Sequence, residues 1–540
     1  MTRARLVVCG DVVLAATARG LERGEAIGIA GGRVVSAGTR RDVLDAAAPG
    51  CRVVDLTGHA VIPGLTDSHA HLVALARARR ELRLDDIERP AEMASRLRDA
   101  AAALPAGAWV RGRGWHAQAL ARPAELAAAM GERPAYLVAH DGHSAWASPA
   151  ALRLAGISEA TADPQGGRLE REAAGLTGVL RETALQLMNG IVPPMSLDET
   201  RMALDEQIGA LHALGLTGMT DAGDATDAGG HGAYAALGDT FSTVASLGSR
   251  LDGRLRLRCN LPQAAVPAAA ALGVRTGAPL EGSRTISVGW AKHYADGALG
   301  SHTAALFEPY ADDPDGATGI LRLDREAIAA RAAVAIPAGI SLAVHAIGDR
   351  AAAGVLDALE AAGPRRRGAA PHRLEHLQLL RTGDRARLVG AGLTASMQPI
   401  HAVADRDMAD ASWGDRLADA YAWRSIAAAG ARLVFGSDAP IESVNPWLGI
   451  FAAVARHMPG DARGAWTADE RVPFHLALAA YTSAAGEAAG RPDEGHLRPG
   501  ARADLAVLDA DLATLLAADE RLPAVKATLT LVDGNEVHRS

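Results

Sequence analysis

Five side chains that commonly bind metal ions, and one lysine, stand at the ends of short β-rich runs in this sequence. They are His69, His71, Lys292, His345, His376 and Asp438. Neutral imidazoles and a carboxylate suit zinc first, and also manganese, iron or cobalt. Because alternate residues of a strand point to the same side, His69 and His71 can face one centre. The residue types predict a metal site assembled from distant parts of the chain.

Lys292 needs its own explanation, because a protonated amine is a poor metal ligand. A lysine that is desolvated beside cations can lose its proton and react with carbon dioxide, which gives a carbamate that bridges two ions. Arginine cannot do this, since its guanidinium stays protonated. Of the 55 lysine and arginine residues, only Lys292 and Lys526 are lysine. The carbamate explains why Lys292 is a lysine; an ordinary salt-bridged lysine beside a single ion is the alternative.

The spacing of these side chains indicates a (β/α)8 barrel. Such a barrel of about 250 residues allots roughly 31 residues to each βα unit. His345 and His376 are 31 positions apart, which suits adjacent strands, and Asp438 follows 62 positions later, which suits a skip of one strand. The candidate ligands then fall on strands one, four, five, six and eight.

Alternating strands and alanine-rich helices in the middle of the chain also favour a parallel α/β architecture. Eight strand candidates end in polar or glycine residues. They are 60–65, 216–220, 254–261, 285–290, 340–344, 373–377, 393–397 and 432–435. We therefore predict an α/β fold with a (β/α)8 TIM-type barrel over residues 61–489.

Three further regions complete the predicted organisation. Residues 80–205 are too many for one crossover and predict an inserted α/β subdomain, with a helix at 91–103 and strands at 109–111 and 135–138. Residues 301–319 are rich in Asp, Gly and Pro and predict a long active-site loop. Short β-rich runs at both ends, 1–60 and 490–540, predict a small antiparallel β-sandwich built from both termini.

Charge and composition exclude several classes of protein. The net charge of −8 and the lack of a basic cluster argue against nucleic-acid binding. Three cysteines without paired spacing suit a reducing compartment. No apolar run approaches the roughly 18 residues of a membrane helix, and the first apolar run is too short for a signal peptide. We expect a cytoplasmic protein that acts on a small molecule, without nucleic-acid or membrane partners; a homodimer is compatible with the sequence.

Five motifs together resemble the YtcJ-like branch of the amidohydrolase superfamily, which includes N-substituted formamide deformylases. They are PGLTDSHAH, GWAKHYADGALGSHTAAL, LAVHAIGDRA, RLEHLQ and VFGSDAP. The similarity runs from near residue 32 to near residue 504. The resemblance implies one ion on His69, His71 and Asp438 and a second on His345 and His376. It also implies that N6-carboxylated Lys292 bridges the two.

The resemblance further implies a reaction. A hydroxide between two divalent ions would attack an amide-like carbonyl, and Asp438 would pass its proton to the leaving nitrogen. The expected activity is hydrolysis of a non-peptide C–N bond, in an N-formyl or N-acyl amine or a cyclic amide. Two alternatives stay open on the same barrel: a mononuclear deaminase, or a lactone or ester hydrolase. A catalytically inactive scaffold is a third, disfavoured because no ligand is missing.

Several other residues are candidates around the centre. The predicted substrate contacts are His143, Trp115, Tyr294, Asp296 and Gln398. Trp447 is a further candidate, although most buried tryptophans fill a core. Asp349 either orients an imidazole or caps a loop. Glu375, beside His376 in a strand, should point the other way and serve a structural role.

Overall fold

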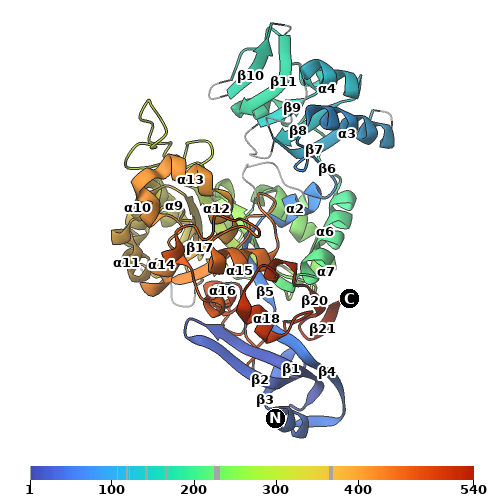
Figure 1. Cartoon of the computed structure of the whole chain (residues 1–540), viewed down its shortest axis with the longest axis vertical. Coiled ribbons are helices and arrows are strands. Elements are labelled where there is room, and N and C mark those ends of the chain that lie inside the picture. The colour runs from blue at the N-terminus through green and yellow to red at the C-terminus, as the bar shows by residue number, and fades with distance from the viewer. Residues whose placement is uncertain are drawn as a thin grey trace. The chain divides into compact units, whose positions relative to one another are not determined.

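The computed structural model describes residues 2–105, 107–116, 120, 122–139, 144–164, 167–173, 175–223, 232–363 and 369–540. The chain divides into two compact units, which are described separately (Figure 1). The first comprises Met1–Val73 and Glu206–Ser540, and the second comprises Ala74–Asp205. His143 lies outside the described residues, so its predicted substrate contact stays a prediction.

Eight parallel strands form a nearly closed barrel in the first unit, as predicted. In sheet order they are β18 (Arg432–Phe435), β17 (Thr394–Met397), β16 (Arg373–His376), β15 (Leu342–Ala346), β14 (Ile286–Tyr294), β13 (Arg256–Pro262), β12 (Leu216–Asp221) and β5 (Leu65–Ala70). The two end strands, β18 and β5, contact each other. Beyond β18, the backbone N–H of Asp438 donates to the carbonyl of His69 over 2.7 Å. The closing hydrogen bond therefore joins two predicted ligand segments.

Helices follow or precede most of these strands, as a βα barrel requires. They are α6 (Leu197–His212), α7 (Asp239–Leu251), α8 (Val266–Ala271), α9 (Arg325–Ala335), α10 (Asp349–Ala361), α11 (Thr382–Gly390), α12 (Pro399–Ala404), α13 (Arg406–Trp413), α14 (Trp423–Ala428), α15 (Pro446–Ala455), α16 (Phe474–Ala480) and α17 (Ser483–Ala488). Residues 295–324 form neither helix nor strand, which confirms the predicted long loop. Its place at an active site stays a prediction.

The predicted position of the first barrel strand was wrong, because the strand lies about one strand length later in the sequence. Residues Ala60 to Pro63 end β4 (Ala47–Pro63), whereas the barrel strand is β5. β4 pairs with β1 (Ala4–Thr17) and β19 (Leu505–Leu508). Gly64 separates the two strands, and a Cβ there would collide with the side chain of Thr217. One apolar run thus serves two sheets in succession. As a result His69 lies within β5, and His71 directly follows it.

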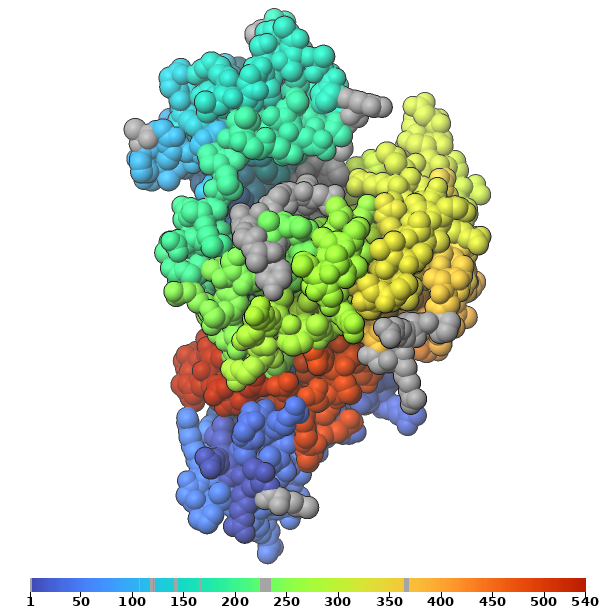
Figure 2. Space-filling view, turned by 180° about the vertical axis from the view of Figure 1, so that it is seen from behind, coloured from blue at the N-terminus to red at the C-terminus, as the bar shows by residue number. Residues whose placement is uncertain are grey.

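Strands from both chain ends form one seven-stranded sheet. In order they are β21 (Asn535–Arg539), β20 (Ala527–Val532), β19 (Leu505–Leu508), β4, β1 (Ala4–Thr17), β2 (Gly20–Ala30) and β3 (Arg33–Gly38). Figure 2 shows N-terminal segments, in blue, beside C-terminal segments, in red. β1 and β4 are parallel, so the expectation of a purely antiparallel assembly was wrong. A two-layered sandwich with the predicted boundaries stays a prediction.

The second unit contains a six-stranded mixed sheet. Its order is β10 (Gly167–Glu172), β11 (Gly175–Glu182), β9 (Ser144–Ala147), β8 (Ala135–Ala139), β7 (Val110–Trp115) and β6 (Leu82–Arg83). Helices α3 (Pro90–Ala103) and α4 (Pro123–Met130) contribute Leu97 and Leu126 to the core that this sheet covers. The predicted helix at 91–103 and the strands at 109–111 and 135–138 are confirmed as α3, β7 and β8. In the described part of the chain, every helix lacks the length or the apolar character needed to cross a bilayer.

Candidate metal centre

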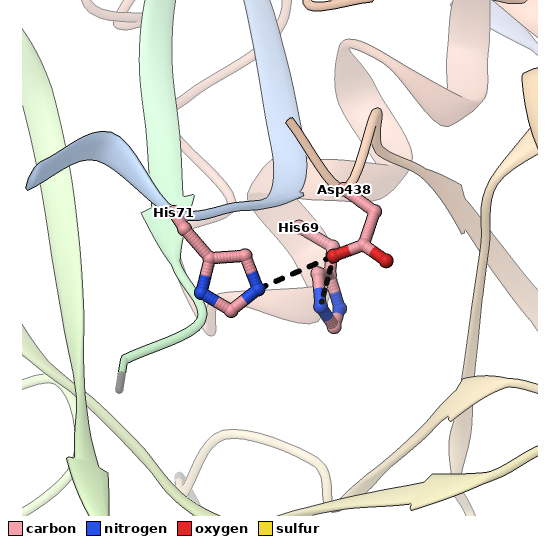
Figure 3. Close-up of side chains that lie close together, drawn as sticks. All are labelled: His69, His71 and Asp438. Carbon is pink, nitrogen blue, oxygen red and sulfur yellow. Dashed lines mark ion pairs between the residues drawn. The ribbon is translucent and has the colours of Figure 1, made fainter. Parts of the chain in front are cut away.

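His69, His71 and Asp438 meet at the C-terminal end of the barrel strands. Figure 3 shows both imidazoles turned toward the carboxylate of Asp438, which comes from the loop after β18. The Oδ1 atom of Asp438 lies 3.4 Å from Nε2 of His69 and 3.2 Å from Nε2 of His71. Asp438 has φ of +60°, a left-handed conformation that aspartate tolerates better than most residues. This turn brings its carboxylate back toward β5.

The opposite nitrogen of each imidazole is held by the protein. Nδ1 of His69 lies 2.6 Å from Oε2 of Glu375, and Nδ1 of His71 lies 2.7 Å from the carbonyl oxygen of Gly223. An acceptor at Nδ1 fixes the proton on that nitrogen and leaves Nε2 with its lone pair toward Asp438. Both imidazoles are therefore oriented as metal ligands.

A second group lies on the other side of Asp438. Its Oδ2 atom is 3.2 Å from Nε2 of His401, and ligand atoms of His376, His401 and Asp438 lie within 4.8 Å of one another. The rings of His376 and His345 are 4.5 Å apart between centroids, and those of His376 and His69 are 4.9 Å apart. The structure thus brings all five predicted histidine and aspartate ligands into one cluster.

Lys292 is buried within β14, with 2% of its surface exposed. Its Nζ lies 5.0 Å from the ring centre of Tyr294, whose ring is 5.5 Å from that of His345. Burial lowers the pKa of Lys292, opposed by the charges of Glu375 and Asp438. Burial, followed by the charge of Lys292, lowers the pKa of His345 to about 3. Lys292 is therefore a desolvated amine beside the imidazole cluster, and burial makes its proton easier to lose than that of an exposed lysine.

Two buried imidazole nitrogens at the centre have no hydrogen-bond partner among the described residues: Nε2 of His69 and Nδ1 of His376. An unsatisfied buried polar atom costs about 1–3 kcal/mol. Burial opposes ionisation of Asp438, but its interactions with the neighbouring imidazoles of His401, His69 and His71 hold its pKa well below its ordinary value. Free lone pairs around an ionised carboxylate suit a cation, so the residues present fit divalent metal ions.

Sequence reasoning missed His401. It lies on α12, four residues beyond the end of the seventh barrel strand, β17. Burial by itself would lower the pKa of His401, but Asp438, Asp405 and Glu442 raise it to about 9. The available signal was a histidine just after a strand candidate, in the run QPIHA. His401 escapes the strand spacing because it lies within the helix after β17.

The expectation that Glu375 points away from the centre was wrong. Glu375 accepts a hydrogen bond from His69 and pairs with buried Arg373. His376 and Leu377 have φ of +75° and +46°, so the strand alternation fails at the end of β16. This backbone turn lets Glu375 and His376 both reach the centre, although they are neighbours in sequence.

Glu375→Gln is expected to weaken metal binding by about 10- to 100-fold, as loss of a carboxylate behind a ligating histidine commonly does. The amide cannot hold the Nδ1 proton of His69 as a carboxylate does, so Nε2 becomes a weaker donor. Competition with a zinc chelator measures the change. Glu360→Gln, which removes a partly exposed partner of Arg387, is the matched control. Equal zinc affinity in both variants would contradict the role of Glu375.

Asp296 organises the loop beside the centre. Its two carboxylate oxygens accept hydrogen bonds from the backbone N–H groups of Ala305, Ile347 and Gly348, and Oδ1 lies 3.5 Å from Nε2 of His345. Burial raises the pKa of Asp296 to about 7, against these hydrogen bonds. These contacts support a role for Asp296 in positioning His345. The predicted contact of Asp296 with a substrate stays a prediction.

The remaining candidates have varied surroundings. The indole N–H groups of Trp115 and Trp447 donate to backbone carbonyls, and both rings are buried in cores. Gln398 occupies the N-cap position of α12 without a side-chain capping hydrogen bond, and its Nε2 lies 3.5 Å from the carbonyl oxygen of Ser396. Asp349 begins α10 and accepts from the N–H of Phe307, so its loop-capping alternative is supported. The predicted substrate contacts of Trp115 and Gln398 stay predictions.

An eight-stranded parallel barrel with a histidine and aspartate cluster at the C-terminal ends of its strands is typical of hydrolases that use metal ions. The chain belongs to the amidohydrolase family, because the model of that family matches residues 52–538. The predicted resemblance to the YtcJ-like branch is confirmed. The chain is 30% identical over 520 residues to the putative amidohydrolase YtcJ of Bacillus subtilis (strain 168), covering 94% of this chain and 95% of that protein.

Two further relatives extend the comparison. N-substituted formamide deformylase of Arthrobacter pascens is 29% identical over 544 residues, which covers 94% of each chain. The crystal structure of an uncharacterized metal-dependent hydrolase from Pyrococcus horikoshii OT3 superposes with a TM-score of 0.77 at 23% identity, covering 95% of this chain and 99% of that one. The first supports the family, and the second supports the fold.

Proposed function

We propose that this protein hydrolyses a non-peptide C–N bond of a small molecule, in an N-formyl or N-acyl amine or a cyclic amide, with two divalent ions. The observation that carries the proposal is the pair of buried imidazole nitrogens, on His69 and His376, that lie on either side of Asp438 and lack a hydrogen-bond partner in the described part of the chain. Similarity to a formamide deformylase supports the substrate class.

The ligand sets follow from the cluster. His69, His71 and Asp438 would hold one ion, and His345 and His376 would hold the other. A carbamate on Lys292 would join the two sets. When bound, such ions lower the pKa of water and polarise a carbonyl oxygen.

Groups of the protein itself would orient the metal ligands and transfer the proton. Glu375 and the carbonyl of Gly223 hold His69 and His71 in place. His401 donates to Oδ2 of Asp438, whereas Oδ1 faces His69 and His71. Asp438 would accept a proton from the attacking water and deliver it to the leaving nitrogen.

Metal analysis tests the proposal. Protein grown with added zinc is expected to contain two ions per chain, and removal of the metal by a chelator is expected to abolish hydrolysis. Turnover is then assayed on N-formyl amines, N-acyl amino acids, hydantoins and lactones. One ion per chain at full activity would refute the two-ion centre. Turnover of lactones alone would refute C–N hydrolysis.

A further inference from the structure

A cavity of about 750 Å³ lies at the end of the barrel opposite the histidine cluster. The first residues of β13 and β14 line one side, and the turns of the seven-stranded terminal sheet line another. The candidate metal ligands stand at the C-terminal ends of the barrel strands. The cavity is therefore separate from the candidate metal centre and belongs wholly to the first unit.

Arginine dominates the charged lining of this cavity. Six arginines line it: Arg5, Arg256, Arg258, Arg284, Arg491 and Arg502. Its acidic lining residues are Glu494 and Asp533. Such an excess of positive charge is unexpected in a chain whose net charge is −8. The ion-pair partners of these arginines decide how much of the positive charge is neutralised.

Carboxylates neutralise four of the six. The pairs are Arg256 with Asp504 and Asp533, Arg258 with Glu494, Arg284 with Asp252, and Arg502 with Asp493 and Asp533. Arg5 and Arg491 have no carboxylate partner among the described residues. Arg491 donates instead to the carbonyl oxygen of Gly277 over 2.7 Å. Two guanidinium groups therefore lie at the cavity wall without a paired carboxylate among the described residues, that of exposed Arg5 and that of partly buried Arg491.

We propose that this cavity binds a small organic dianion, of the class of phosphate monoesters. Planar guanidinium groups bind phosphate oxygens through paired, charge-assisted hydrogen bonds. The two unpaired guanidinium groups can each contact oxygens of a doubly charged phosphate monoester. The volume lies within the roughly 300–1,000 Å³ of ordinary small-molecule sites. Ser287, also in the lining, adds a neutral hydroxyl donor.

The bound dianion would join parts of the chain that are far apart in sequence. Arg5 belongs to β1, whereas Arg491 follows α17 near the C-terminal end. A ligand that contacts both would tie the terminal sheet to the base of the barrel. Because a ligand that binds only the folded state stabilises it, the melting temperature should rise with its concentration.

Isothermal titration of the zinc-loaded protein with AMP tests this site, at constant ionic strength and with neutral adenosine as the comparison probe. One AMP per chain is expected, with no binding of adenosine. The double variant Arg5→Gln/Arg491→Gln is expected to bind AMP at least about tenfold more weakly, since two charge-assisted contacts are lost. Arg325→Gln, at an exposed position that begins α9, is the matched control.

A second variant separates this site from the candidate metal centre. His345→Asn is expected to bind AMP with unchanged affinity, whatever its metal content. The proposal is overturned if AMP does not bind, if adenosine binds equally well, or if the double variant binds AMP as tightly as the Arg325→Gln control. Loss of AMP binding in His345→Asn would also overturn it, because that result places the nucleotide at the metals. None of these results depends on hydrolysis.

Discussion

Lys292→Arg is expected to abolish hydrolysis, by at least about a thousandfold, and to lower the metal content below two ions per chain. Arginine is similar in size and charge, but its guanidinium stays protonated and cannot form a carbamate. The variant would also keep a permanent positive charge against His345 and His376, whose imidazoles already sense the charge of Lys292. Turnover and zinc content of the purified protein are the two measurements.

The chain supplies its own control for this experiment. Lys526 is the other lysine and is exposed near the C-terminal end, so Lys526→Arg should leave activity and metal content unchanged. Lys292→Ala leaves a space that a short carboxylic acid such as propionate can enter. Partial recovery of turnover with added propionate would support the carbamate. Two tightly held ions per chain in Lys292→Arg would refute the carbamate. A metal content of one ion per chain that does not change in Lys292→Ala would favour the mononuclear alternative.

Asp438→Asn should lower turnover by about 10²–10⁴-fold, the range associated with loss of general acid–base catalysis. The substitution keeps the shape of the side chain but removes the charge that His69, His71 and His401 surround. An amide can neither accept the proton from water nor balance these imidazoles. The variant should also bind zinc more weakly, because a ligand has lost its charge.

The pH profile gives Asp438→Asn a second readout. Interactions with the three histidines depress the pKa of Asp438 in the folded chain, so its carboxylate stays ionised through the neutral range. Protonation of Asp438 at low pH should cause a fall in kcat/KM in the wild-type protein. That fall should be absent in Asp438→Asn. Asp315→Asn, at an exposed position of the loop after β14, is a control that should change neither readout. Wild-type turnover in Asp438→Asn would remove Asp438 from the proton path.

The positions of most barrel strands could be predicted from the local sequence pattern. The strands that contain or precede Lys292, His345 and Asp438 were located within a few residues, because β-rich runs alternate with alanine-rich helices. The first strand was misplaced because one apolar run continues through Pro63 and Gly64 into a different sheet. Local hydrophobicity cannot show which sheet a residue joins, since the last four residues of β4 are as buried as those of β5.

The errors at the site have a related cause. Glu375 was assigned to the outer face by strand alternation, which the positive φ of His376 interrupts. His401 was missed because it reaches Asp438 from the helix after β17, beyond the strand itself. Both residues depend on backbone turns that no periodic pattern encodes.

Residue chemistry, spacing and motif order were enough to predict the barrel, the family and the six residues proposed to hold metal. These features are local or simply ordered along the chain, so they can be read without coordinates. Tertiary structure alone decided which atoms face Asp438, which partners fix each imidazole, and where arginines lack carboxylates. Those properties arise when barrel closure and packing of the terminal sheet bring groups hundreds of residues apart into contact, and burial makes each contact costly to leave unpaired.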